Sequence, residues 1–359
     1  MANVLVTDLK VVDSPQAGIG VARCLNDMGH NVYGADDTPL VTTSDIFKET
    51  FVLEEIRTLN LDSLLNRLVD IKNKHNIEYI IPCYDETSIL LSFIRDKLDF
   101  IGINLIAPDF ESIKLIRKSN LENIVHGVNN VSVPNYKVVN TLKEALYYSK
   151  KIKYPVYVKG LTKAALRAEN PQELESQINK ISNIWNGGII NCIIQKEIKG
   201  KYKNVLLALK SNKIVAYQEM EKIAIDSNGA TWFGKLISNT DLMLITEKIC
   251  SKIKNSHACI IELEFIESSN GIFLYEINPI PPAWIYASAL NGLNFPSILL
   301  FDKISKIGKC ANEVFFGRET IDFLNKQMPQ NYTNENLYYY NKGVAYKNSN
   351  TKYPSEILF

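Results

Sequence analysis

The most constraining feature of the sequence is a run of apolar residues that alternates with carboxylates on both sides of a short polar turn. The run occupies residues 261–279, and the turn lies at Ser268 to Gly271. Because alternate residues of a strand share a face, the pattern predicts a β-hairpin with Glu264, Glu276 and Asn278 on one face. Such oxygen ligands suit Mg²⁺, which completes its shell with water and phosphate oxygens. A hairpin whose acids only face solvent would show the same alternation.

The composition is that of a globular chain without excess charge. Of the 359 residues, 46% are apolar, and 40 basic residues balance 39 acidic ones. Nucleic acid is therefore not the expected partner, because nothing in the net charge attracts a polyanion. The length allows two or three domains of ordinary size.

The cysteines and the apolar runs exclude several other classes of protein. The six cysteines lie far apart, and no pair has the C-x-x-C spacing of a zinc site or redox motif. No apolar run is long enough to span a membrane, and the N-terminus enters a strand without the features of a signal peptide. We therefore expect a reduced, soluble, cytoplasmic protein that contacts no membrane.

The first hundred residues alternate short apolar runs with amphipathic stretches. Strands are expected at Val4 to Thr7, Asn31 to Ala35, Tyr79 to Pro82 and Asn104 to Ala107. Helices are expected at Gly20 to Gly29, Leu61 to His75 and Thr87 to Leu98. This order predicts a parallel sheet with helices on both faces.

Two glycines in this region allow two interpretations. Gly18 and Gly20 resemble part of a dinucleotide-binding fingerprint, but the third glycine position is Arg23 and the glycines do not directly follow the first strand. That fingerprint needs a turn immediately after the strand. We prefer the interpretation in which the glycines let a loop turn closely into a helix.

The remainder of the chain is richer in strands, largely antiparallel, with flanking helices. Helices are expected at Phe110 to Val125, Leu142 to Ile152, Pro171 to Trp185 and Asp241 to Ile253. Strands are expected at Pro155 to Gly160, Ile189 to Glu197, Asn204 to Lys210, Ile214 to Glu219 and Thr231 to Phe233. The last fifty residues are polar, and we expect them to wrap the body of the protein.

Four segments, in this order, resemble the ATP-grasp superfamily in its carbamoyl-phosphate-synthase large-subunit-like branch. They are Ile80 to Glu86, Tyr154 to Lys159, Ile194 to Gly200 and the hairpin end, Glu276 to Pro279. The resemblance implies an α/β and α+β fold, with a Rossmann-like pre-ATP-grasp domain followed by a two-lobed ATP-grasp domain. The implied divisions are 1–107 for the first domain, 108–310 for the second with lobes 108–198 and 199–310, and 311–359 for an extension packed on the body.

The resemblance also implies residues for the metal and the phosphates. Glu264, Glu276 and Asn278 would hold the Mg²⁺ that bridges the ATP phosphates. Lys159 would contact the α- and β-phosphates from its strand. Lys222 would be the catalytic cation, facing the phosphates from a central strand, although a surface lysine fits its sequence context equally well.

The implied adenine site lies at the hinge between the lobes. The edge of the base would be hydrogen-bonded to the main chain around Glu197 and Ile198. The side chain of Gln195 or Lys196 would lie nearby.

Four positions depart from the usual ATP-grasp pattern. The glycine-rich phosphate loop is replaced by Gly160 to Ala165, which keeps one glycine, and the acid expected on the ribose falls at Lys201 or Tyr202. Ile280 stands where an arginine is usual, which removes a permanent cation. Lys118 lies one position before the expected lysine of its helix.

These features lead to one main hypothesis and two alternatives. The main hypothesis is an ATP-dependent ligase that joins a small-molecule acid to an amine, or acts on a peptide, through an acyl phosphate. The first alternative is a degenerate ATP-grasp protein that binds a nucleotide or a partner without ligase turnover. The second is a nicotinamide-dependent oxidoreductase using the glycines near residue 18. The oligomeric state is left open, with a homodimer as one option.

Overall fold

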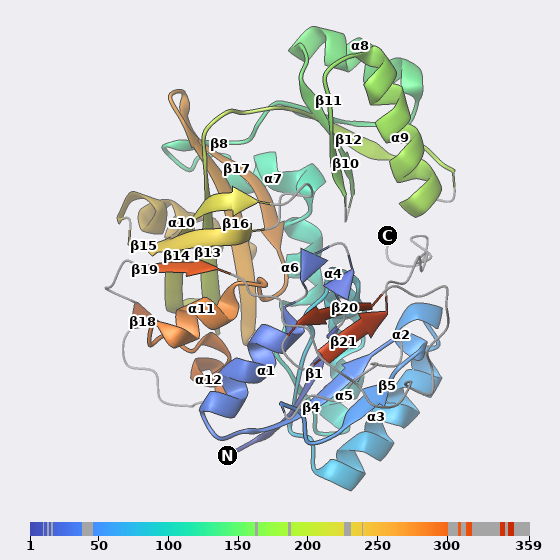
Figure 1. Cartoon of the computed structure of the whole chain (residues 1–359), viewed down its shortest axis with the longest axis vertical. Helices are drawn as coiled ribbons and strands as arrows, with labels where there is room; N and C mark the ends of the chain where they lie inside the picture. The colour runs from blue at the N-terminus through green and yellow to red at the C-terminus, as the bar shows by residue number, and fades with distance from the viewer. Residues whose placement is uncertain are drawn as a thin grey trace.

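The structure is a computed structural model of the chain. It describes residues 1–9, 11–12, 14–15, 17–37, 46–161, 164–185, 188–225, 231–238, 240–300, 308–309, 314–317, 338–341 and 344–347. Figure 1 shows a parallel-sheet part at the lower right, a large sheet on the left and a small lobe at the top. Among the described residues, no helix is long and apolar enough to cross a membrane.

The N-terminal part is a five-stranded parallel sheet, as the alternating pattern predicts. Its strand order is β5-β4-β1-β6-β7, which places the first strand at the centre. The strands are β1 (Asn3–Thr7), β4 (Asn31–Asp36), β5 (Thr50–Val52), β6 (Tyr79–Ile81) and β7 (Asn104–Leu105). The helices are α1 (Gly18–Asp27), α2 (Glu55–Thr58), α3 (Leu61–His75), α4 (Asp85–Phe93) and α5 (Arg95–Phe100). Strand β5 was not predicted, because its three half-buried residues are too few to show a period.

The interpretation that a glycine lets the loop turn closely into a helix is confirmed at Gly18. Helix α1 begins at Gly18, and a Cβ built there would lie 2.6 Å from the Asp8 carbonyl oxygen and 2.9 Å from that of Thr7. The helix therefore starts against the backbone at the end of β1. Only a residue without a side chain allows this approach.

The small lobe is a four-stranded antiparallel sheet covered by two helices. Its strand order is β11-β10-β12-β9. The strands are β9 (Tyr136–Val139), β10 (Val156–Gly160), β11 (Ala165–Ala168) and β12 (Cys192–Lys196), and the helices are α8 (Leu142–Ile152) and α9 (Pro171–Trp185). Val156, Val158 and Ile194 pack with both helices in one buried cluster.

The third part is a large, mostly antiparallel sheet with the order β19-β15-β14-β13-β16-β17-β8, in which β18 also pairs with β14. Its strands are β8 (Val131–Ser132), β13 (Lys201–Lys210), β14 (Lys213–Ile225), β15 (Thr231–Ile237), β16 (Cys259–Ser268), β17 (Gly271–Asn278), β18 (Gly308–Lys309) and β19 (Val314–Gly317). Its helices are α6 (Phe110–Leu115), η1 (Lys118–Asn120), α7 (Leu121–Val125), α10 (Thr240–Ile253), α11 (Ile285–Leu290) and α12 (Phe295–Leu300).

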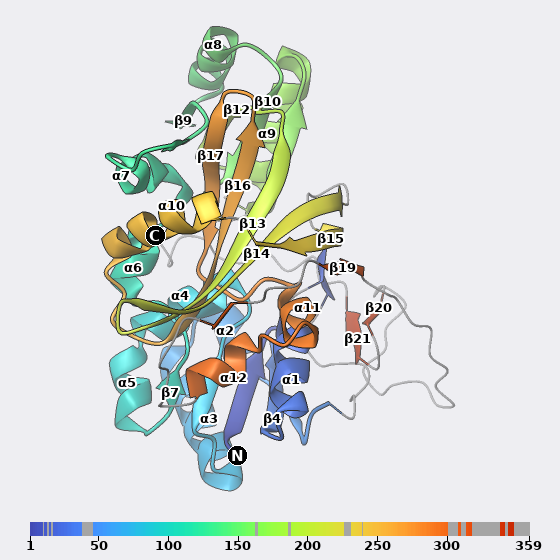
Figure 2. The ribbon, with the colours of Figure 1, turned by 90° about the vertical axis from the view of Figure 1, so that its left-hand side faces the viewer.

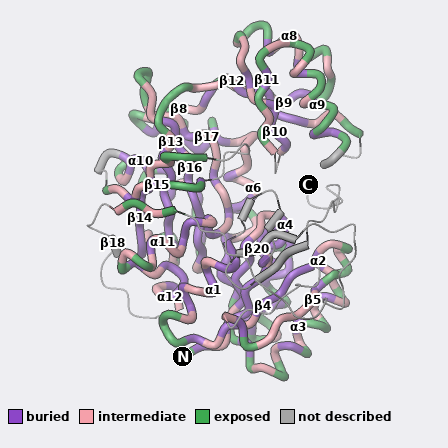
Figure 3. Tube along the Cα trace, viewed as in Figure 1, coloured by how far each residue is buried: buried purple, intermediate pink, exposed green. Residues whose placement is uncertain are grey.

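The two faces of this sheet belong to different cores. One face packs with α7 and α10. The other packs with α12 and with α1 of the parallel-sheet part. Figure 3 shows the buried residues concentrated on the central strands of both large sheets. Four short strands lie apart from these sheets: β2 (Val11–Val12) pairs with β3 (Ser14–Pro15), and β20 (Tyr338–Asn341) pairs with β21 (Val344–Lys347). Of the expected extension at 311–359, the structure describes β19, β20 and β21, and the rest lies outside the described residues. The division into domains stays a prediction.

Two helices predicted as continuous are broken. The expected helix at Phe110 to Val125 is interrupted before η1, and Asn120 Nδ2 donates to the Lys114 carbonyl oxygen at 3.0 Å. The expected helix at Thr87 to Leu98 breaks at Ile94. The buried guanidinium of Arg95 follows this break and donates to the carbonyl oxygens of the chain leaving β7. Side-chain hydrogen bonds to backbone carbonyl oxygens thus accompany the break of the local helix pattern in both places.

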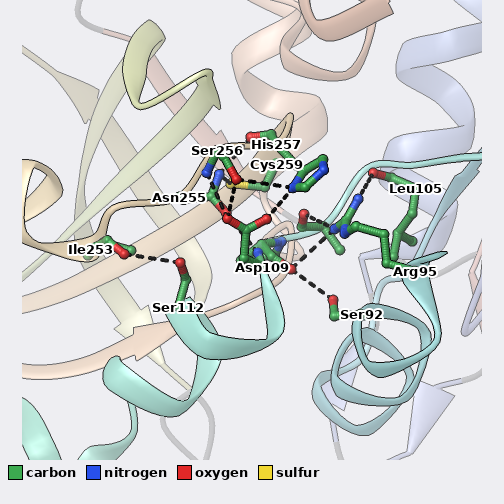
Figure 4. Close-up of polar contacts among 12 residues, drawn as sticks. Ser92, Arg95, Leu105, Asp109, Ser112, Ile253, Asn255, Ser256, His257 and Cys259 are labelled. Carbon is green, nitrogen blue, oxygen red and sulfur yellow. Dashed lines mark hydrogen bonds and ion pairs between the residues drawn. The ribbon is translucent and has the colours of Figure 1, made fainter. Parts of the chain in front are cut away.

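A polar cluster joins the parallel-sheet part to the large sheet (Figure 4). Asp109, at the start of α6, accepts hydrogen bonds from the backbone and hydroxyl of Ser256, both at 2.7 Å, and its other carboxylate oxygen contacts His257. The Asp109 backbone N–H donates to Asn255 Oδ1 at 2.8 Å. The chain that leaves the first sheet is therefore fixed to the segment that enters β16.

Replacement of Gly18 by alanine should destabilise the protein by about 1–3 kcal/mol, the usual cost of overpacking. The added Cβ would meet two backbone oxygens that cannot move without shifting β1. Urea denaturation of Gly18→Ala measures the loss. Gly20→Ala in the same helix is the matched control, because its nearest atom is an Ile285 methyl at 3.1 Å, which can yield. Equal losses for the two variants would contradict the close-packing role.

Candidate functional site

The predicted hairpin forms, and its register brings the predicted ligands together. Strands β16 and β17 are antiparallel, with Glu264 opposite Glu276 and Glu262 opposite Asn278. Figure 2 shows the pair running from the large sheet up to the small lobe. Alternate residues share a face, so Ile260, which is buried in the core, lies on the same face of β16 as Glu262 and Glu264.

A β-bulge adds one side chain to this face. The register shifts between Glu264 and Phe265, so that Tyr275 and Glu276 together lie opposite a single residue. Leu274 and Ile277, on either side, both pack into the core on the far face. Tyr275 is thereby turned to the face that carries Glu264, where its hydroxyl donates to Glu264 Oε2.

Two lysines neutralise the two carboxylates of the hairpin. Lys222 Nζ lies 2.8 Å from Glu264 Oε2, with the side chains only 8% and 12% exposed. Lys118 Nζ lies 3.0 Å from Glu276 Oε1. Burial alone would raise the pKa of Glu264, but Lys222 and the hydrogen-bond donors around it lower that pKa to about 2. Burial would likewise lower the pKa of Lys222, whereas the carboxylates beside it raise it.

A further carboxylate of the hairpin, which the sequence did not single out, lies beside this pair and is buried. Glu262 accepts hydrogen bonds from Asn204 at 2.6 Å, from the Trp284 indole at 2.7 Å and from Asn278 at 3.1 Å. Burial and the neighbouring charge of Glu264 raise the pKa of Glu262 to about 7. In sequence Glu262 looks like one more alternating acid, and only its register opposite Asn278 distinguishes it.

Lys159 reaches the hairpin from the small lobe. Its ammonium lies 3.5 Å from the Tyr275 carbonyl oxygen and 4.9 Å from the centre of the Tyr275 ring. The residue is only 4% exposed. Burial lowers the pKa of Lys159 to about 8, against the opposing effect of Glu276. The predicted phosphate lysine and the predicted metal hairpin therefore meet between the lobes.

The four predicted adenine residues do not all face this region. Gln195 pairs with Tyr157 and is buried on the same face of the small sheet as Lys159. Lys196 lies on the opposite face, where Nζ donates to the Lys153 carbonyl oxygen at 2.7 Å.

The last two hinge residues follow strand β12. Glu197 is held by Arg167, whose Nε lies 2.6 Å from Oε1. Ile198 comes next and is half-buried. Of the two side chains expected near adenine, only Gln195 lies on the Lys159 face.

The parallel-sheet part contributes helix α4 to the same region. Ser88 Oγ donates to the Pro279 carbonyl oxygen at 3.0 Å, which fixes α4 against the end of β17. Asp85 begins this helix, and burial raises its pKa to about 7, with Lys118 opposing and Glu276 adding to the rise. The site is therefore built from all three parts of the chain.

The donor set at the hairpin suits a magnesium ion. Glu264 and Glu276 offer hard carboxylate oxygens, and Asn278 offers an amide oxygen. Within the described ranges, no three His, Cys, Asp or Glu side chains are grouped as metal ligands. A magnesium ion here would therefore depend on the amide, water and phosphate oxygens for the rest of its shell.

Removal of the Lys222 ammonium should be costly, because Glu264 would remain as an uncompensated, mostly buried charge. We expect Lys222→Met to lower the free energy of unfolding by about 3–5 kcal/mol, measured by chemical denaturation. Lys201→Met is the matched control: its ammonium lies 3.4 Å from Glu221 but the side chain is 67% exposed, so its loss should stay below about 1 kcal/mol. Similar losses in the two variants would show that Glu264 does not depend on Lys222.

Comparison by sequence finds no match to a protein-family model or to a curated protein. Comparison of folds finds several similar enzymes. N5-carboxyaminoimidazole synthetase from Staphylococcus aureus superposes with a TM-score of 0.63 at 15% identity, over 88% of this chain and 82% of that one. The biotin carboxylase domain of Hydrogenobacter thermophilus 2-oxoglutarate carboxylase, in a complex with MgADP and bicarbonate, gives 0.62 at 17% identity, over 85% and 71%.

An L-amino acid ligase from Bacillus licheniformis gives a TM-score of 0.61 at 11% identity, over 86% of this chain and 75% of that one. These similarities cover 85–88% of the chain, and they confirm the α/β and α+β architecture expected from the sequence. The chain therefore has the ATP-grasp fold, with its acidic hairpin in the large sheet and in contact with Lys159 of the small lobe.

Proposed function

We propose that the protein is an ATP-dependent carboxylate–amine ligase that works with Mg²⁺ and forms an acyl phosphate. The observation that carries the proposal is the hairpin pair Glu264 and Glu276, which shares its face with Asn278. Lys159 of the small lobe contacts Tyr275 on the same hairpin. Two hard carboxylates and several cations around one cleft suit a phosphate chain with its metal.

In the proposed reaction, a substrate carboxylate attacks the γ-phosphate of ATP, ADP leaves, and an amine displaces phosphate from the acyl phosphate. Phosphoryl transfer needs positioning and charge neutralisation more than a protein nucleophile. Mg²⁺, held by Glu264, Glu276 and Asn278, would supply Lewis-acid charge to the phosphates. Lys159 would contact the α- and β-phosphates, and Lys222 would add positive charge from β14.

The departure at Ile280 is consistent with this scheme. The residue lacks the arginine cation, but Lys118 brings an ammonium to Glu276 from η1. Arg167, another cation of the small lobe, pairs with Glu197 and Glu169 and not with a carboxylate of the hairpin. We therefore assign the missing charge to Lys118 and leave Arg167 as a support of the hinge.

The similar folds support the reaction class. Their names include an L-amino acid ligase and a biotin carboxylase in complex with MgADP. We propose the same class of substrate here, a small-molecule acid with an amine, or a peptide. A cytoplasmic location and a homodimer belong to the same proposal. The alternative is a protein that binds a nucleotide without turnover. It differs from the proposed ligase in one measurable property, the release of ADP and phosphate.

Release of ADP and phosphate in the presence of Mg²⁺, ATP and a panel of amino acids and dipeptides tests the proposal. The wild type should show acid-dependent release, and Glu276→Gln should abolish it while leaving the fold intact, because one charge of the metal site is lost. Glu267→Gln on β16, 41% exposed, is the control that should retain activity.

Tight binding of Mg·ATP by the wild type without release of ADP would favour the protein without turnover. Normal magnesium dependence of release in Glu276→Gln would remove the hairpin from the metal site. No nucleotide binding at all would defeat both functions.

Lys159→Ala should weaken binding of a non-hydrolysable ATP analogue by about 1–3 kcal/mol at neutral pH, the range for a hydrogen bond to a charged group. Because the pKa of Lys159 is lowered to about 8, the ammonium is present below that pH and is lost as the pH rises through it. The analogue's affinity for the wild type should therefore fall above about pH 8.

Lys159→Arg should keep its affinity over this range, because guanidinium stays charged. Titration calorimetry at several pH values separates the variants. Lys137→Ala, an exposed lysine of the same sheet, is the control. An unchanged affinity in Lys159→Ala would place this lysine outside the nucleotide site.

A further inference from the structure

The carboxylate of Glu262 is the best-anchored polar group near the hairpin that the proposed reaction does not use. The residue is 5% exposed, and its oxygens accept three hydrogen bonds from three segments of the chain. Asn204 on β13 and Trp284 before α11 both donate to Oε1, at 2.6 and 2.7 Å. Asn278 on β17 donates to Oε2 at 3.1 Å. This arrangement is built to hold one acceptor group in one position.

The partner that matters is Asn278, because its amide has two ends with opposite chemistry. Asn278 Nδ2 donates to Glu262 Oε2 at 3.1 Å and to Glu264 Oε1 at 2.9 Å. Both N–H bonds of the amide group are therefore committed to carboxylates. A flipped amide would place its oxygen against two acceptors, so the two carboxylates together fix which end of the amide is the oxygen.

A metal ligand must present oxygen, and the amide nitrogen of an asparagine cannot serve. The two carboxylates hold the nitrogen end, so Oδ1 is directed away from them. Glu264 alone could not fix the amide in the presence of a metal, because its carboxylate is itself a proposed ligand. Glu262 is held from behind by Asn204 and Trp284 and stays available for this purpose.

We propose that Glu262 is a positioning residue that orients Asn278 as an oxygen ligand of Mg²⁺. The proposal rests on the proposed function, since it assumes that Mg²⁺ binds at the hairpin. The carboxylate acts through Asn278 and does not touch the metal or the nucleotide. An amide at position 262 could not replace it, because glutamine has a single acceptor oxygen and its NH₂ would face one of the donors around it.

The test is the metal-dependent part of nucleotide binding. Affinity for a non-hydrolysable ATP analogue is measured by calorimetry in Mg²⁺ and again in EDTA, for the wild type and for Glu262→Gln. Replacement of a residue that orients a metal ligand usually costs about 10–100-fold in metal affinity. We therefore expect the gain in affinity from EDTA to Mg²⁺ to be at least about tenfold smaller in Glu262→Gln than in the wild type. The affinity in EDTA should be the same in both proteins.

One control and one further variant separate positioning by Glu262 from a general loss of structure. Glu267→Gln, on the same strand but 41% exposed, should keep the whole Mg²⁺-dependent gain. Trp284→Phe removes one donor from Glu262 Oε1 and leaves Asn278 in contact, so it should lose a smaller part of the gain. This second variant keeps the proposal testable if Glu262→Gln does not fold, because an unchanged gain in Trp284→Phe would then overturn it.

A spectroscopic readout tests the ligand directly. With Mn²⁺ in place of Mg²⁺, the electron paramagnetic resonance spectrum of the protein–analogue complex should change in Glu262→Gln and remain unchanged in Glu267→Gln. A Glu262→Gln protein with the wild-type Mg²⁺-dependent gain and the wild-type Mn²⁺ spectrum overturns the positioning role. A wild type that binds the analogue equally in Mg²⁺ and in EDTA instead contradicts the proposed metal site, so the two failures are distinguishable.

Discussion

The interaction on which the site depends is the neutralisation of the hairpin carboxylates. Glu264 and Glu276 lie opposite each other in a mostly buried region, where two like charges would repel strongly without compensation. Lys222 from β14 and Lys118 from η1 each supply one ammonium. Since these lysines come from segments far apart in sequence, the acids can be buried only when the large sheet and η1 are assembled together.

A third lysine, Lys159, brings the small lobe into contact with the same hairpin. Lys159 adds a third ammonium from the small lobe, against the face and carbonyl of Tyr275. Tyr275 is on that side only because of the β-bulge, and its hydroxyl donates to Glu264 as well. One tyrosine therefore contacts both the lysine of the first lobe and an acid of the second. Phosphate oxygens entering the cleft would meet ammonium groups that are already gathered.

Much of the fold could be read from the sequence, because it rests on local periodicity. The period of two in residues 261–279 gave the hairpin and its cleft-facing acids, and the strand–helix alternation gave the parallel sheet. Gly18 could be interpreted correctly because only glycine permits a helix to begin against a strand backbone. The choice between Gln195 and Lys196 beside adenine stays a prediction, and the alternation along β12 puts the two side chains on opposite faces.

The residues that sequence reasoning missed depend on contacts between distant segments. Lys118 was judged one position out of register, but the break before η1 turns its side chain onto Glu276. Strict alternation along β17 would place Tyr275 on the face opposite Glu276, and the bulge reverses that direction. Glu262 carries no local signal at all, because its partners on β13, β17 and the segment before α11 are set by the assembled sheet.

The central claim is that the β16–β17 hairpin holds the metal of a bound nucleotide. A crystal structure of the protein with Mg²⁺ and a non-hydrolysable ATP analogue tests it most directly. The account predicts a metal ion at about 2.1 Å from oxygens of Glu264, Glu276 and Asn278, with phosphate oxygens completing its shell and Lys159 beside them. A nucleotide bound elsewhere, or a metal held by phosphates without these three side chains, would contradict the account.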